Sequence, residues 1–347
     1  MTKLPASWYI AVPATRVTKQ KPVKLDLFGK ALVAWRDARG QPTVMERYCS
    51  HMGANLALGK LKEDCLECPF HGWQFDRTGQ CSYAPDIVKP PKTAFQPTYP
   101  VVEKYGYLWV WHGSVVPLYP VPYFLAFEEA RKQHMSLRFA FKVKTTPRRV
   151  LENAYDNYHF IRVHGLQATT APLTLRNQAS FKSRQLADLP LEARFGGTME
   201  AQVERFVGPA GVVARALGLS VENFRLETES WPGGHIITLF LDNEAKFTAL
   251  VTVTPVAEHY TIQQNLLLVK KTGKFGPDLA QYTAFGLQTI LSGLQDVPIW
   301  NNMLAEGGGA YSKNDRGVLE FRKFYQKWIE RSEQEQAYAK PELFQRS

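Results

Sequence analysis

Residues 48–53 read YCSHMG and residues 68–73 read CPFHGW, and these two short stretches decide how the rest of the chain is interpreted. Each contains one cysteine and one histidine, spaced Cys-x-His in the first and Cys-x-x-His in the second. Glycine and proline beside these residues allow the sharp turns that would bring the two stretches together. The pattern predicts a metal or metal-cluster site whose ligands are Cys49, His51, Cys68 and His71.

The mixed composition of each stretch indicates the kind of site. A zinc finger usually places its cysteines in one pair and its histidines in the other, whereas here each stretch supplies one of each. The mixture is typical of a [2Fe–2S] centre in which one iron takes two thiolates and the other takes two imidazoles. The alternative is a zinc ribbon built on Cys65 and Cys68, which would leave His51 and His71 without a role.

All four cysteines of the chain fall between Cys49 and Cys81. A disulfide scaffold would spread them through a short secreted chain, and the N-terminus MTKLPASWYI lacks the charged and then apolar run of a secretory signal. We therefore expect a cytoplasmic protein in which Cys65 and Cys81 are packed free thiols.

A second group of candidate ligands lies in a later segment without glycine or proline, which predicts a helix. Glu152, Asp156 and His159 are spaced four and three residues apart and would share one helical face. His164 follows five residues later, so it can bind the same metal as His159 only if the helix bends or ends between them. Gly165, a common residue at helix ends, predicts such an ending. Two imidazoles and one carboxylate form a usual ferrous site for dioxygen activation.

Both groups resemble those of one known family. The two cysteine–histidine stretches resemble the Rieske motif of ring-hydroxylating oxygenases more than that of respiratory complexes, which carry an extra cysteine in each ligand loop; here Ala54, Gly72 and Trp73 stand at those places. The pattern Asp-x-x-His-x4-His that begins at Asp156, with an acid four residues before it, resembles the iron-binding helix of the same oxygenases. The resemblance covers nearly the whole chain and is to an alpha subunit of the single-component branch, with its steroid hydroxylase-like and natural-product tailoring monooxygenases.

This resemblance assigns roles to the residues. It implies a [2Fe–2S] cluster on the first group and Fe(II) on His159 and His164. Asp156 would not bind iron but would link His159 to the partner subunit's His71. Glu152 would orient the metal-binding residues without contacting the metal itself.

The carboxylate ligand is expected on a late helix, where the family places its third ligand. Asp296 follows a predicted helix over residues 279–295 and is the best candidate, with Asp315 and Glu320 as alternatives. Pro298 predicts that this helix kinks or stops just past Asp296.

The predicted fold is α+β, with an all-β Rieske domain over residues 1–117 and a catalytic domain over residues 118–347. Short strands separated by turn residues are expected in the first domain, at 31–36, 43–48 and 105–111. A proline-rich passage that begins at Pro117 separates the domains. Longer strands are expected in the second domain, at 235–241, 247–256 and 261–269. Strands without regular alternation with helices predict an antiparallel sheet, and the resemblance implies a helix-grip (START-like) fold.

The chain has 42 basic and 32 acidic residues, a net charge of +10. Its basic clusters are short, so we expect a solvated basic surface and no nucleic-acid partner; a docking patch for an acidic protein remains open. No apolar stretch is long enough for a membrane span. The resemblance implies a head-to-tail homotrimer, dioxygen as co-substrate, and electrons from NAD(P)H that arrive through a separate reductase, with or without a ferredoxin.

The predicted function is therefore a Rieske oxygenase that hydroxylates, desaturates or demethylates a bulky hydrophobic compound. Two alternatives remain open at this point, a Rieske electron carrier without mononuclear iron and a zinc-dependent binding module. The substrate pocket is expected between the sheet and the helix over residues 279–295. The residues expected to line it are mostly apolar: Phe160, Ile161, Leu239, Leu250, Val251, Leu266, Leu268, Phe285, Thr289 and Ile290.

Overall fold

The computed structural model describes residues 3–168, 171–176, 184–218 and 220–344. These residues combine helices with antiparallel sheets, which confirms the predicted α+β class. The chain divides into two compact units. The first unit comprises Met1–Val121, Thr254–Glu258 and Trp328–Ser347, and the second comprises Pro122–Val253 and His259–Lys327. Because two late segments group with the first unit, no two continuous ranges describe the division, and the domain limits of 1–117 and 118–347 stay a prediction.

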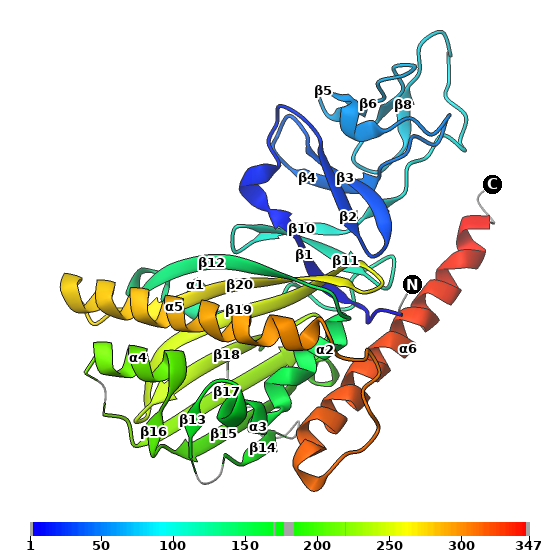
Figure 1. Cartoon of the computed structure of the whole chain (residues 1–347). Helices are drawn as coiled ribbons and strands as arrows, with labels where there is room; N and C mark the ends of the chain where they lie inside the picture. Colours follow the sequence, from blue (N-terminus) through cyan, green and yellow to red (C-terminus); the bar gives the residue numbers. More distant parts are fainter. Residues whose placement is uncertain (1–2, 169–170, 177–183, 219, 345–347) are drawn as a thin grey trace. The chain divides into compact units, whose positions relative to one another are not determined.

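The N-terminal part of the first unit is built from short strands. They are β1 (Ser7–Pro13), β2 (Val23–Leu27), β3 (Lys30–Arg36), β4 (Pro42–Glu46), β5 (Lys60–Lys62), β6 (Cys65–Glu67), β7 (Gln74–Phe75), β8 (Cys81–Tyr83), β9 (Thr98–Tyr99), β10 (Val101–Lys104) and β11 (Tyr107–His112). Within the described residues they form three sheets, in the orders β1-β11-β10, β2-β3-β4-β9 and β5-β6-β7-β8 (Figure 1).

The strands predicted for this unit are found with small shifts. The strand over 31–36 is confirmed as β3, and the one over 43–48 ends two residues early, in β4. The strand predicted at 105–111 begins at Tyr107, because Tyr105 and Gly106 both have positive φ values, 57° and 77°, and form the turn before it. Positive φ is incompatible with an extended strand.

The second unit contains one large sheet. Its strands are β12 (His134–Val143), β14 (Leu173–Arg176), β15 (Phe195–Gln202), β17 (Asn223–Trp231), β18 (Gly234–Leu241), β19 (Glu244–Ala257) and β20 (Tyr260–Lys270), and a separate ribbon pairs β13 (Leu166–Gln167) with β16 (Arg205–Phe206). The described part of the large sheet has the order β12-β20-β19-β18-β17-β15-β14. The strands predicted at 235–241, 247–256 and 261–269 are confirmed as β18, β19 and β20.

Helices complete the second unit, and the last of them, α6 (Arg316–Phe344), continues into the segment that groups with the first unit. The helices are α1 (Leu125–Glu128), α2 (Pro147–Glu152), α3 (Asn157–Arg162), α4 (Gly208–Ala216), α5 (Phe275–Trp300) and α6, with short 3-10 helices η4 (Asn153–Tyr155) and η7 (Lys313–Asp315). Figure 1 shows α5 running along one face of the sheet, where Phe285 packs with Val251 and Leu267 in one apolar cluster. None of the helices in the described residues has the length and apolar composition needed to cross a lipid bilayer.

The helix that carries Asp296 is longer than predicted. It begins at Phe275 and continues through Pro298 to Trp300, so it does not stop just past Asp296, and the alternative of a kink there stays a prediction. Pro298 lies in the last turn of α5, where the carbonyl groups need hydrogen-bond donors from residues beyond the helix. The Asn301 N–H donates to the Val297 carbonyl (3.0 Å), and the side chain of Asn302 donates to the Pro298 carbonyl (2.8 Å). These bonds satisfy the end of the helix despite the proline.

Candidate functional site

The two cysteine–histidine stretches form two loops with the same hydrogen-bond pattern. One loop follows β4, and the other joins β6 to β7. The N–H groups of Cys49 and Cys68 each donate to the carbonyl five residues later, at 2.9 and 2.7 Å. Gly53 and Gly72, each the fourth residue after its cysteine, have φ values of +72° and +69°. Only glycine adopts this conformation readily, which explains its place in both loops.

The two loops bring the two cysteines together and, separately, the two histidines. The thiols of Cys49 and Cys68 lie within hydrogen-bonding distance of each other. Burial, together with this neighbouring thiol, raises the pKa of Cys49 to about 11. The His51 and His71 rings have centroids 4.8 Å apart, and Trp73 stacks on His51 at 4.2 Å. A thiol pair and a separate imidazole pair fit a cluster with one sulfur-ligated and one nitrogen-ligated iron. Cluster binding must release the thiol protons.

The remaining cysteines lie outside this arrangement. The Cys65 Sγ is 3.3 Å from the Ser82 Oγ, and the Cys81 Sγ is 3.3 Å from the Tyr83 carbonyl. Burial raises the pKa of both thiols. All four cysteines are free thiols in the structure, as packed non-ligand cysteines would be.

No sequence pattern singles out Gln96, a residue that holds the first loop. Gln96 is buried, and its side-chain nitrogen donates to the carbonyls of Glu46 (2.6 Å) and Tyr48 (2.9 Å). Its side-chain oxygen accepts from the Ser50 N–H at 3.1 Å. Gln96 thus fixes the chain on both sides of Cys49, from a segment far along the sequence whose spacing carries no motif.

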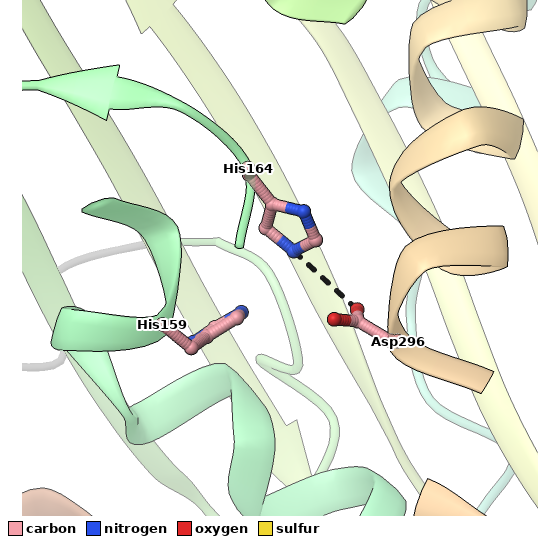
Figure 2. Close-up of side chains that lie close together, drawn as sticks. All are labelled: His159, His164 and Asp296. Carbon is pink, nitrogen blue, oxygen red and sulfur yellow. Dashed lines mark ion pairs between the residues drawn. The ribbon is translucent and has the colours of Figure 1, made fainter. Parts of the chain in front are cut away.

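A second cluster of ligand-type residues lies in the second unit. Donor atoms of His159, His164 and Asp296 all lie within 4.8 Å of one another. Figure 2 shows the three side chains converging from α3, from the segment just after it, and from α5. The His164 Nε2 is 3.4 Å from the Asp296 Oδ2. Two imidazoles and a carboxylate at this spacing fit a ferrous ion.

The segment that carries the histidines is not one helix. After α2 and η4, Asp156 has φ −93° and ψ 93°, which breaks the helix before α3 begins. The prediction that Glu152, Asp156 and His159 share a single helical face is therefore wrong. The predicted ending between the two histidines is confirmed, because α3 stops at Arg162 and Gly165 has a φ of +73°. This ending lets His164 turn back toward His159.

Asp156 makes the helix break possible. Its carboxylate Oδ1 accepts from the N–H groups of Tyr158 (3.2 Å) and His159 (3.3 Å), and so caps the start of α3. Aspartate is among the preferred residues at this position because it satisfies the free N–H groups of the first turn.

Hydrogen bonds orient both histidines. The His159 Nδ1 contacts the Asp156 carbonyl, and the His164 Nδ1 is 3.2 Å from the Gln295 Oε1. An Nδ1 that donates to an oxygen leaves the Nε2 lone pair free for a metal. The Asn153 side-chain nitrogen lies 3.2 Å from the His159 Nε2. The Nδ1 of each ring thus lies beside an oxygen acceptor, and the His164 Nε2 lies beside the Asp296 carboxylate.

Electrostatics differ between the two histidines. Burial lowers the pKa of His159 below its usual value, although the Asp296 carboxylate opposes this. Burial also acts to lower the pKa of His164, but the hydrogen bond and charge of Asp296 outweigh it and raise that pKa overall. A metal would compete with the proton for the nitrogen of His164.

Glu152 lies in an ion cluster. The Arg322 Nε donates to its Oε2 at 2.6 Å, the Arg322 Nη2 donates to its Oε1 at 2.8 Å, and the Arg149 Nη1 also contacts Oε1. Its side chain is 4% exposed. These contacts join α2 to α6, and an orienting role toward the metal residues stays a prediction.

The alternative carboxylates have other partners. The Asp315 Oδ2 accepts from the backbone N–H and the hydroxyl of Ser312, in the capping box that starts η7. Glu320 pairs with Lys323 at 2.8 Å on α6, both partly exposed. Of the three candidates, the structure brings only Asp296 to the two histidines.

A cavity of about 250 Å³ adjoins two of the three residues, His164 and Asp296, which lie in its wall. The rest of the wall comes from the large sheet, the β13–β16 ribbon, α3, α4 and α5. It lies between the sheet and α5, as predicted.

Half of the predicted lining residues face this cavity, namely Phe160, Leu239, Val251, Phe285 and Thr289. The others do not line it, and for Leu250, Leu266 and Leu268 the reason is strand alternation. On β19, Ala249 and Val251 face the cavity, so Leu250 points to the other side of the sheet. The same alternation on β20 places Gln263 and Asn265 in the wall and Leu266 and Leu268 elsewhere. Hydrophobicity alone could not separate the two faces.

Family models match both parts of the chain. A model described as "Rieske [2Fe-2S] domain" matches residues 7–105. A model described as "3-Ketosteroid 9alpha-hydroxylase C-terminal domain" matches residues 109–329.

Known proteins are similar over nearly the full length. Aminopyrrolnitrin oxygenase PrnD of Pseudomonas fluorescens is 41% identical over 95% of this chain and 93% of its own. The oxygenase component of 3-ketosteroid-9-alpha-monooxygenase from Rhodococcus rhodochrous is 23% identical over 94% of this chain and 83% of its own. A crystal structure of dicamba monooxygenase with non-heme iron and dicamba matches with a TM-score of 0.67 at 16% identity, over 94% of this chain and 97% of that one. At this identity, the structural similarity shows the fold.

Proposed function

This chain belongs to the Rieske non-heme iron oxygenases, and from that membership we propose that it uses O2 and reductase-supplied electrons to oxidise a bulky hydrophobic organic compound. The cofactors of the family are a Rieske [2Fe–2S] cluster and a non-heme ferrous ion. The observation that carries the proposal is the convergence of His159, His164 and Asp296 beside a largely apolar cavity that His164 and Asp296 line.

Each residue of the two sites has a proposed role. When bound, the ferrous ion would activate dioxygen, and the cluster would supply electrons one at a time. His159 and His164 would hold the ferrous ion through Nε2, and Asp296 through its carboxylate. The cluster would be held by the paired loops, through Cys49, His51, Cys68 and His71.

The route of the electron between centres would involve Asp156. We propose that Asp156 links His159 to the partner subunit's His71, as the family resemblance implies. Two features support this: His71 is exposed on its loop, and Asp156 already contacts His159 through its backbone. Glu152 would hold α2, and with it the start of this segment, in place.

The proposed partners follow from this electron path. Electrons would come from NAD(P)H through a separate reductase, with or without a ferredoxin, and the chain would act as a head-to-tail homotrimer. The net charge of +10 would favour an acidic donor. Reduction rates that do not change with salt would contradict this last point.

Oxygen uptake tests the proposed activity. Aminopyrrolnitrin is the first compound to try, because the relative that is 41% identical carries it in its name. Uptake with a reductase and NAD(P)H should increase on addition of a substrate of this bulky, apolar class. Asp296→Ala should abolish the increase, whereas Asp315→Ala, the matched carboxylate outside the site, should keep it. Equal activity of Asp296→Ala and the wild type would contradict the proposal.

A further inference from the structure

The wall of the cavity is not uniformly apolar. Most of its lining side chains are aliphatic or aromatic, but Gln263 and Asn265 of β20 line it together with Gln288 and Ser292 of α5. Among the described residues that line it, only His164 and Asp296 can carry a charge. One side of the cavity therefore offers neutral amides, and an ionised group would enter at the cost of losing its water.

Each of the two glutamine nitrogens makes one hydrogen bond to a neighbouring side chain. The Gln288 Nε2 donates to the Ser292 Oγ at 3.1 Å, and the Gln263 Nε2 donates to the Asn265 Oδ1 at 3.4 Å. The side-chain oxygens of Gln263 and Gln288 are buried and have no hydrogen-bond partner among the described residues. A buried acceptor without a partner destabilises the protein because it has lost its hydrogen bonds to water. Two such oxygens at one cavity therefore indicate acceptors that a ligand can satisfy.

Gln288 lies on the same helix as Asp296, so the distance between them can be estimated. Gln288, Ser292 and Asp296 follow one another along the cavity-facing side of α5. Gln288 lies about two turns, or roughly 12 Å along the axis, from Asp296. A compound of two linked or fused rings can reach from one to the other.

We propose that Gln263 and Gln288 are specificity-determining residues that select a neutral, largely apolar compound of two or more rings with an N–H or O–H donor. The side-chain oxygen of Gln263 or Gln288 accepts from this donor and sets which part of the compound faces the metal residues. This inference rests on the proposed function, because the compound is the substrate of the proposed oxygenase.

The test compares two probes of the same shape, 2-phenylindole and 2-phenylbenzofuran, which differ only in an N–H or an oxygen at one ring position. Binding to the iron-loaded full chain is measured by equilibrium dialysis without oxygen, so that no turnover is needed. The wild type should bind 2-phenylindole about five- to tenfold more tightly, the usual net effect of one hydrogen bond. Equal binding of the two probes, or binding of neither, would overturn the proposal.

Variants identify the residues responsible. The double variant Gln263→Met/Gln288→Met keeps side-chain size and should reduce the preference to about one, while 2-phenylbenzofuran binding stays unchanged. Gln264→Met makes the same change on the opposite face of β20 and should retain the preference. A retained preference in the double variant would overturn the assignment.

Two further readouts keep the conclusions separate. If the amides served only the fold, the Met variants would unfold at lower temperature with no change in the ratio of the two affinities, and that result also overturns the proposal. Oxygen uptake is a separate measurement, so an inactive chain that still prefers 2-phenylindole would contradict the proposed function and not this inference.

Discussion

At the scale of single residues, the orientation of His164 depends on one neighbour. The Gln295 Oε1 is the acceptor for the His164 Nδ1, and Gln295 directly precedes Asp296. Such supporting partners typically contribute 10- to 100-fold to metal affinity. We predict that Gln295→Leu weakens iron binding by about 10- to 100-fold, measured by competition with a ferrous chelator.

The matched control for this prediction is Gln281→Leu, which makes the same change earlier in α5, at a residue that does not line the cavity. It should bind iron as the wild type does. Unchanged affinity in Gln295→Leu would mean that the ring is held by other contacts.

Much of the site can be predicted from single residues. The four residues of the paired loops and the two histidines are identifiable because each motif places its ligands close together in the chain. Asp296 needs the resemblance, since a single acid on a helix has no distinguishing local pattern. Gln96 and Gln295 are not predictable, because each acts through a partner that lies far along the sequence.

At the scale of elements, the break before α3 and the end of α3 before His164 bring His159 and His164 together. Asp156→Ala removes the N-cap and should lower the free energy of unfolding by about 1 kcal/mol. Asp156→Asn keeps a capping side chain and should keep that stability and the bound iron. Urea unfolding and iron content check both expectations.

The same pair of variants separates two roles of Asp156. If it also links the two centres of neighbouring subunits, Asp156→Asn should retain both cofactors but lose oxygen uptake. Normal uptake in Asp156→Asn would show that Asp156 serves only as the cap of α3.

The ion cluster of Glu152 gives an element-scale prediction about stability. Removing one member of a buried pair leaves the other charge unpaired, at a cost of about 3–5 kcal/mol. Glu152→Gln should therefore destabilise the second unit by an amount in this range, because Arg149 and Arg322 lose their carboxylate. Glu320→Gln breaks an exposed pair on α6 and should cost less than about 1 kcal/mol.

Iron content measured in the same variants addresses the orienting role. If Glu152→Gln is folded at low temperature and keeps its iron, Glu152 contributes to stability alone. Loss of iron while the chain is still folded would support the orienting role.

Element positions are predictable where the sequence alternates clearly. The strands β18, β19 and β20 are rich in Ile, Leu, Val and Thr and lie at the expected positions, whereas no signal singled out β12, β15 and β17. The helix before His159 was predicted as continuous because its sequence has no glycine or proline. A capping aspartate inside such a sequence can begin a new helix, and the pattern alone does not show this.

At the scale of the whole molecule, the proposed electron path requires two copies of the chain. A variant without the cluster, Cys49→Ser/Cys68→Ser, and a variant without the mononuclear iron, Asp296→Ala, should each be inactive alone. Mixed oligomers, made by co-expression with two different tags and purified through both, should regain part of the oxygen uptake, because the intact cluster of one copy would serve the intact iron of the other.

The control for this experiment is a mixture of two differently tagged Asp296→Ala chains, which should stay inactive. If the mixed oligomers are as inactive as this control, electrons do not pass between copies in the way proposed.

The central claim is that one chain holds two separate iron centres, and iron and acid-labile sulfide analysis after anaerobic purification tests it most directly. We predict about three irons and two sulfides per chain, with His159→Ala losing about one iron and keeping both sulfides. His259→Ala, an exposed histidine in the turn between β19 and β20, should lose nothing. Two irons per wild-type chain, unchanged in His159→Ala, would contradict the account.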